Sequence, residues 1–156
     1  MMKKKKKLIL LVVIIGITVA VSIAAYMFYK PHRDVQSART DLTISATELV
    51  NEYLSNADLA NIKYLDEAGL SKILEVNGIV HSITEDYNNQ KVVLIKSPEA
   101  NAGVSCTFTM ETNASAEALK VGQLVRIKGV IRSGAAYDED LGLYEHVILE
   151  KSDVIK

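Results

Sequence analysis

The chain has 156 residues, one cysteine and a formal net charge of −1 at pH 7, but its charges are unevenly distributed. Six of the 18 Lys and Arg residues fall within the first 30 positions, so residues 31–156 hold 12 basic side chains against all 19 acidic ones, a charge of −7. Such a segment repels phosphate polymers over long range, and a single cysteine excludes an intramolecular disulfide. About 126 residues suffice for one domain with an ordinary apolar core.

The amino-terminal segment has the pattern of a membrane anchor. Five lysines at positions 3–7 precede an uncharged run of 22 residues that begins at Leu8 and ends at Tyr29. At about 1.5 Å per residue, this run makes a helix of about 33 Å, enough to cross a hydrocarbon core of about 30 Å. Lysine-rich flanks stay in the cytoplasm. We therefore expect a cytoplasmic tail over 1–7 and a transmembrane helix over 8–29, with the lipid bilayer as a partner, in a single-pass protein of the bacterial inner membrane. The remaining domain would be extracytoplasmic.

A cleaved signal peptide is the alternative interpretation of the same run. Ser22 and Ala24 have the small side chains of a cleavage site, and cleavage would release a secreted protein. The apolar run nevertheless continues to Tyr29 and Lys30, an aromatic and cationic border typical of an uncleaved span. The only cysteine, Cys106, lies far along the chain, so no acylated cysteine can follow the apolar run.

A linker and then a helix are expected after the anchor. Residues 30–44 are polar, contain Pro31 and show no apolar period. Ser45 and Glu48 then fit a capping box, in which each side chain satisfies a free backbone N–H group. The helix that follows places six apolar residues on one face: Leu49, Val50, Tyr53, Leu54, Ala57 and Ala60. Residues 61–71 should form a bend or loop.

Short strands separated by turn signals fill the rest of the chain. We expect five of them, over residues 73–83, 91–96, 104–111, 124–132 and 143–151. The third alternates most clearly, and its inward face would hold Val104, Cys106, Phe108 and Met110. Gly78 should permit a bulge or sharp coil in the first strand. Residues 115–119 should form a helical turn, and 134–142 an acidic loop.

The expected fold is mainly β: a five-stranded antiparallel OB-fold barrel preceded by an α-helix, spanning residues 45–156. The sequence resembles the tRNA-anticodon-like OB-fold family of bacterial exported proteins. The likeness rests on five pieces, which are 48–56 (ELVNEYLSN), the Lys63-Tyr64 pair, 76–80 (VNGIV), 104–108 (VSCTF) and 119–129 (LKVGQLVRIKG). The resemblance implies a helix followed by an OB barrel in a membrane-linked or secreted protein of unassigned activity. The connection over 65–71 is longer than in that family's pattern.

The usual ligand face of such barrels lies on the second and third strands and the neighbouring loops. We expect that face here to include Tyr87, Lys91, Ser105, Thr107, Thr109 and Tyr137. Its hydroxyl groups offer no stacking surface, and the acids at 138–140 would repel phosphate, so nucleic acid is an unfavoured ligand. The basic stripe of Arg126, Lys128 and Arg132 is typical of a solvated strand face.

No catalytic, metal or cofactor site is expected, and the protein should not be an enzyme. Cys106 falls on the inward face of its strand, where a thiol is inert. The acidic loop lacks the ligand spacing of an EF-hand. His81 and His146 do not match the His-x-x-x-Tyr arrangement of haem chaperones. The sequence thus favours a binding module for an envelope protein or glycan, with a single-stranded nucleic-acid-binding OB-fold protein as the alternative.

Overall fold

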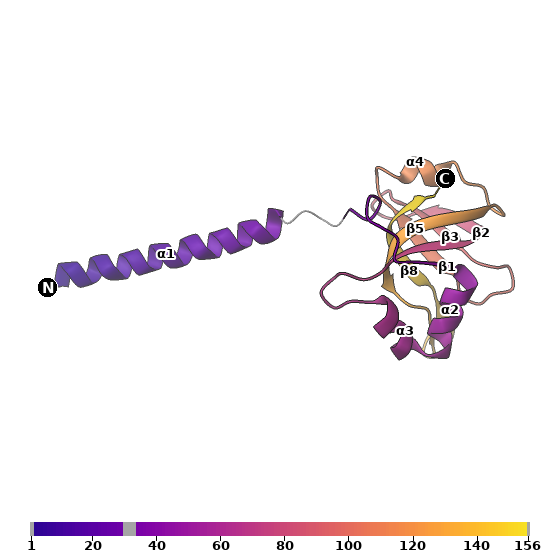
Figure 1. Cartoon of the computed structure of the whole chain (residues 1–156), viewed down its shortest axis with the longest axis horizontal. Coiled ribbons are helices and arrows are strands. Elements are labelled where there is room, and N and C mark those ends of the chain that lie inside the picture. The colour runs from indigo at the N-terminus through magenta and orange to yellow at the C-terminus, as the bar shows by residue number, and fades with distance from the viewer. Residues whose placement is uncertain (1, 30–33, 156) are drawn as a thin grey trace. The chain divides into compact units, whose positions relative to one another are not determined.

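The computed structural model describes residues 2–29 and 34–155, and within the first helix the side chains of residues 12–27. The chain divides into two compact units, Met1–Arg33 and Asp34–Lys156. The first holds α1 (Met2–Tyr29). The second (Figure 1) holds the remaining elements, namely β1 (Leu42–Ser45), α2 (Ala46–Ser55), α3 (Ala57–Tyr64), β2 (Ile73–Glu85), β3 (Lys91–Ile95), β4 (Val104–Phe108), α4 (Asn113–Glu117), β5 (Leu124–Ser133), β6 (Ala136–Asp138), β7 (Leu143–Glu145) and β8 (Val147–Val154).

The first unit is a single helix, and the side chains described in it are all exposed. In the part of the chain that the structure describes, no helix combines the length and the apolar character that crossing a membrane requires. The predicted transmembrane helix over 8–29 is therefore not confirmed. Both ends of that predicted span lie outside the described side chains.

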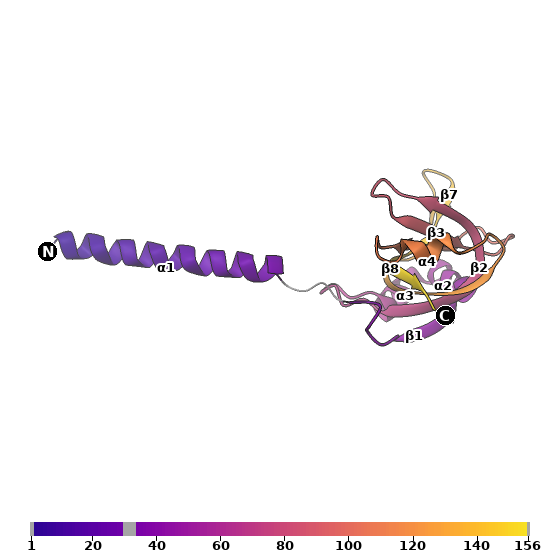
Figure 2. The same ribbon diagram turned by 90° about the horizontal axis from the view of Figure 1, so that it is seen from above.

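The second unit is built around a closed barrel. Its strands follow the order β2-β3-β4-β8-β5, and β5 pairs again with β2 to complete the ring. The first half of β2 pairs with β5 and its second half with β3, so this long strand serves two neighbours in succession. Figure 2 shows how the sheet curls on itself. This arrangement confirms the expected barrel of five strands with a helix before it.

The strands are mixed rather than all antiparallel, which corrects the expected pairing. β4 and β8 run parallel, with Val104 opposite Val147, while the other neighbours in the ring are antiparallel. A closed ring with an odd number of strands cannot alternate direction throughout, so at least one neighbouring pair must be parallel. A second parallel pair joins β1 to the first half of β2 outside the ring.

The single helix expected after Ser45 is two helices. α2 begins as predicted, because the Ser45 hydroxyl accepts a hydrogen bond from the Glu48 N–H group at 3.2 Å. α2 ends at Ser55, and the side chain of the next residue, Asn56, accepts a hydrogen bond from the Leu59 N–H group and caps α3. The break redirects the chain, so Leu54 is exposed although the apolar period places it on the buried face. α3 also occupies residues that we expected to form a loop.

The segment expected to be a linker belongs to the domain from residue 34 onward. Val35 is buried, and residues 42–45 pair with β2 as β1. The Lys128 ammonium group on β5 donates to the backbone carbonyls of Gln36 and Ala38, and the Gln36 amide donates to the carbonyl of Lys151. The polar composition of residues 34–41 does not predict this packing, because the contacts are made largely by backbone carbonyl groups.

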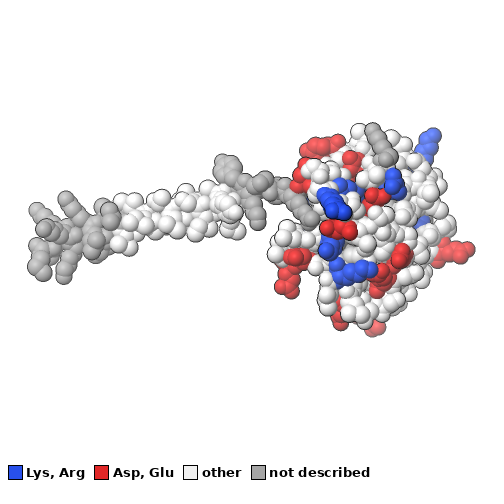
Figure 3. Space-filling model, in the orientation of Figure 1, with Lys and Arg blue, Asp and Glu red and all other residues white. Residues whose placement is uncertain are grey.

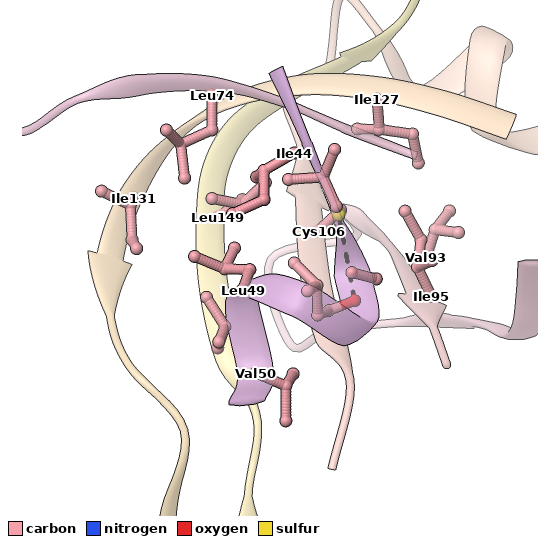
Figure 4. Packing of buried hydrophobic residues seen from close by; sticks show 14 of the residues in the cluster. Ile44, Leu49, Val50, Leu74, Val93, Ile95, Cys106, Ile127, Ile131 and Leu149 are labelled. Carbon is pink, nitrogen blue, oxygen red and sulfur yellow. Dashed lines mark hydrogen bonds between the residues drawn. The ribbon is translucent and has the colours of Figure 1, made fainter. Parts of the chain in front are cut away.

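The core lies inside the barrel and beneath α2 (Figure 4). Val104, Cys106 and Phe108 point inward from β4 as predicted, and the Cys106 thiol approaches the Val104 carbonyl at 3.9 Å. Burial raises the pKa of the Cys106 thiol. Met110 was predicted to share this face but is 60% exposed, because β4 ends at Phe108.

Two details of the strands also differ from expectation. The bulge of β2 falls between Val80 and Ser82 and not at Gly78. A Cβ atom on Gly78 would lie 2.4 Å from Cγ2 of Ile95, so this glycine permits a close approach of strands. The acidic loop and the start of the predicted fifth strand form a separate hairpin of β6 and β7, and the fifth barrel strand is β8.

Candidate binding face

The outward sides of the second half of β2, of β3, of β4 and of β8 form a continuous surface, which we call the outer face. Cross-strand pairing places its residues in rows perpendicular to the strands. One row holds Ser82, Leu94, Ser105 and Ile148, and the next holds Thr84, Val92 and Thr107. Within these strands the alternate residues, such as Val93 and Cys106, point into the core.

The two rows contain hydroxyl and aliphatic side chains and no charged ones, and this composition determines the kind of ligand that they can bind. Hydroxyl groups donate and accept hydrogen bonds, and the interleaved Leu94, Val92 and Ile148 offer aliphatic contact. No aromatic ring on these rows could stack on a base. The surface therefore suits a neutral, hydrogen-bonding ligand such as an extended peptide or a sugar chain.

Lys91 and Tyr87 lie together at the α4 end of the outer face. The Lys91 ammonium group is 2.7 Å from Glu85 and 3.3 Å from Glu117, and these carboxylates raise the pKa of Lys91. Tyr87 is fully exposed in the turn between β2 and β3. Lys91 is thus already paired, while Tyr87 is free to contact a ligand.

The six predicted residues do not form one site. Ser105 and Thr107 lie side by side along the outer face. Thr109 comes after the end of β4, and its N–H group donates to the Thr112 hydroxyl. Tyr137 lies in the β6–β7 hairpin, which follows the end of β5 and therefore adjoins the opposite end of β2 from Tyr87. Its ring packs against Tyr144, with centroids 4.8 Å apart.

Three basic side chains that the sequence pattern does not group together border the other end of the outer face. His81 occupies the β2 bulge, Lys96 follows β3, and His146 precedes β8. The Lys96 N–H group donates to the Ile79 carbonyl at 3.0 Å, and the Gly103 N–H group donates to Nδ1 of His146, so Lys96 and His146 lie on either side of Gly103, with His81 two residues beyond Ile79 on β2. Only strand register reveals this grouping, because the residues are far apart in sequence.

The basic stripe of β5 is only partly open, because Arg126 and Arg132 are exposed as expected while Lys128 is covered. Lys128 is 7% exposed beneath the segment 34–41, which corrects its expected solvated position. Arg126 pairs with Glu75 at 3.0 Å, and the Arg132 Nε atom lies 3.9 Å from Glu150. The face shown in Figure 3 accordingly mixes acidic and basic groups. A continuous track for a phosphate backbone is not formed there.

A groove of about 650 Å³ between α2 and α3 was also missed by sequence reasoning. At its wall, the Lys63 ammonium group lies 2.8 Å from both oxygens of Glu52, and the Tyr64 hydroxyl donates to the same carboxylate at 2.8 Å. The hydrogen bond from Lys63 holds the pKa of Glu52 below its usual value and raises the pKa of Lys63. The Lys63-Tyr64 pair therefore joins the two helices.

Comparisons with known proteins agree with this architecture. A sequence profile of the tRNA_anti-like family matches residues 2–139. A search of curated proteins finds no match. Among solved structures, the chain is similar to one from Klebsiella pneumoniae subsp. pneumoniae that is described as a "putative nucleic acid-binding lipoprotein", with a TM-score of 0.54 and 20% sequence identity, over 81% of this chain and 99% of that chain. At this level of identity the likeness concerns the fold alone.

Proposed function

The chain belongs to the tRNA_anti-like family, and from this premise we propose that its OB-fold domain is a non-enzymatic binding module for a protein or glycan of the cell envelope. The observation that carries the proposal is the outer face. Its two central rows combine hydroxyl and aliphatic side chains without a charge, on the strands that OB-fold proteins commonly use for ligands. A neutral polymer can lie across such rows without the desolvation of a charged group.

The location that we propose is the outer surface of the bacterial inner membrane. The Lys-rich positions 3–7 and the uncharged run 8–29 support an anchor with its amino terminus in the cytoplasm. The structural neighbour is described as a lipoprotein. In this chain Cys106 is buried in the barrel, so an acyl chain on that thiol would disrupt the core. We propose that the uncharged run serves as the attachment instead, with secretion after cleavage as the alternative.

Single-stranded nucleic acid is the second candidate ligand, because the structural neighbour is described as binding nucleic acid. The described residues give this candidate less support. Lys128 is covered and Arg126 is paired, and the central rows have no stacking platform. Tyr87 alone could stack on a base at the α4 end.

A salt titration separates the two candidates. Proteins that neutralise several phosphates lose affinity steeply as salt rises. We expect the full chain to show no saturable binding of a labelled single-stranded oligonucleotide at low salt, as measured by fluorescence anisotropy. Tight binding that weakens steeply with salt, and that is lost in Tyr87→Ala, would instead establish the nucleic-acid function.

A further inference from the structure

The His81, Lys96 and His146 side chains form a basic cluster at one end of the outer face. The His146 ring is held by the backbone, because its Nδ1 atom accepts a hydrogen bond from the Gly103 N–H group at 3.2 Å. In the neutral imidazole the hydrogen then resides on Nε2, which remains a donor. The ring is thus oriented by the backbone and keeps one N–H group for another partner.

Lys96 is positioned by the same glycine. A Cβ atom on Gly103 would lie 2.7 Å from Cβ and 3.0 Å from Cγ of Lys96. Because glycine has no side chain, the aliphatic part of Lys96 can pack directly on the backbone of Gly103, just before β4. The Lys96 ammonium group donates one hydrogen bond to the Ala100 carbonyl at 3.0 Å. Two of its three N–H groups are left for other acceptors.

His81 completes the cluster from the side of β2. The bulge leaves this residue without a partner on β3 and turns its side chain to the surface. Burial, followed by the charges of Lys96 and His81, lowers the pKa of His146. Lys96 and His81 therefore both lie close enough to His146 to disfavour its protonated form.

This group of basic side chains has no internal acidic partner among the described residues. Glu99 lies on the loop after Lys96, and Glu145 precedes His146, yet neither forms an ion pair with the cluster. A metal site is also unsupported, because no group of three metal-ligating side chains occurs in the described part of the chain. The domain as a whole is acidic, which makes a basic cluster without an acidic partner among the described residues more notable.

We propose that His81, Lys96 and His146 bind a carboxylate or phosphate group at one end of the outer face. The inference deepens the proposed function and rests on it for the nature of the ligand, a largely neutral polymer that carries an anionic group. The rows next to the cluster would contact its neutral part. Charge-assisted hydrogen bonds from Lys96 and from the imidazole N–H groups would hold the anion.

The test uses the full-length chain in detergent micelles, titrated separately with inorganic phosphate and with acetate at constant ionic strength. The side-chain NMR signals of His81 and His146 report binding. We expect a saturable shift with at least one anion, and the anion that produces it identifies the acidic group. Lys96→Gln should weaken this binding about fivefold or more, and His81→Gln should also weaken it. Lys72→Gln is the matched control and should leave it unchanged, because Lys72 is an exposed lysine just before β2 whose backbone pairs with Tyr64 and Ile131.

Shifts that grow linearly without saturation for both anions would overturn the site, as would equal effects of Lys96→Gln and Lys72→Gln. Amide spectra of each variant verify that it is folded. The neutral variant Ser105→Gln separates this inference from the proposed function, because it obstructs the central rows and should abolish polymer binding while anion binding persists. Conversely, a variant that loses only anion binding should still bind the neutral part of the polymer at the central rows.

Discussion

Among single residues, Gly134 and Tyr53 form the contact that tolerates least change. A Cβ atom on Gly134 would lie 2.0 Å from two carbons of the Tyr53 ring. That ring is buried and stacks on Tyr64 at a centroid distance of 5.9 Å, and burial raises the pKa of Tyr53 to about 12. The glycine therefore provides the space into which α2 packs.

Gly134→Ala should consequently destabilise the domain by about 1–3 kcal/mol, because a tightly packed ring cannot move without cost. Urea unfolding measures the change. Replacing Tyr53 by Leu should remove most of the additional cost of Gly134→Ala in a double-mutant cycle. An equal cost in both backgrounds would show that the clash is not with the ring.

Glu52 and Lys63 predict a pH dependence of stability. The pKa of Glu52 is below 4.5 in the folded state, so its contribution is present above that pH and is lost as the pH falls through the folded value. The pKa of Lys63 is raised above 10.5, so its contribution is present at neutral pH and is lost only in strong alkali. Side-chain exposures of 32% and 49% imply solvent screening of the pair.

Glu52→Gln should therefore lower the free energy of unfolding by less than about 1 kcal/mol at pH 7, and by still less near pH 3. Urea titrations at the two pH values measure the difference. Glu67→Gln, on the exposed loop after α3, is the control and should have little effect at either pH. A cost of Glu52→Gln that is as large at pH 3 as at pH 7 would contradict the pairing.

At the scale of elements, the sequence predicted those that carry a periodic pattern. The alternation of β4 and the serine cap of α2 both appear where expected, because each depends on neighbours in the chain. β1 was missed because four residues are too few to show an alternation of apolar and polar side chains, and the residues of β2 with which it pairs lie about thirty positions further along the chain. The grouping of His81, Lys96 and His146 was missed for a similar reason, since it depends on register between strands.

The segment 34–41 should contribute to stability as part of the domain. Val35 is 3% exposed, so Val35→Ala should cost about 1–2 kcal/mol in urea unfolding of the full chain. Arg39 is exposed in the same segment, and Arg39→Ala should cost little. Equal effects of the two changes would favour the flexible linker that polar composition suggests.

For the whole molecule, the proposed topology predicts which parts a protease can reach. A protease added to intact spheroplasts should digest the domain that begins at residue 34, since we propose that it lies outside the cytoplasm. A cytoplasmic marker protein should survive in the same sample. Protection of the domain until the spheroplasts are lysed would place it in the cytoplasm and contradict the proposed location.

Site-specific photocrosslinking from the outer face tests the central claim most directly. A photoreactive amino acid at position 105 of the full chain lies in the middle of the uncharged rows, and one at position 67 lies in the exposed loop after α3. The proposed function predicts a discrete, nuclease-resistant adduct from position 105 in living cells, weakened by Leu94→Gln, and none of that size from position 67. A nuclease-sensitive adduct, or identical products from both positions, would contradict a binding face for an envelope protein or glycan.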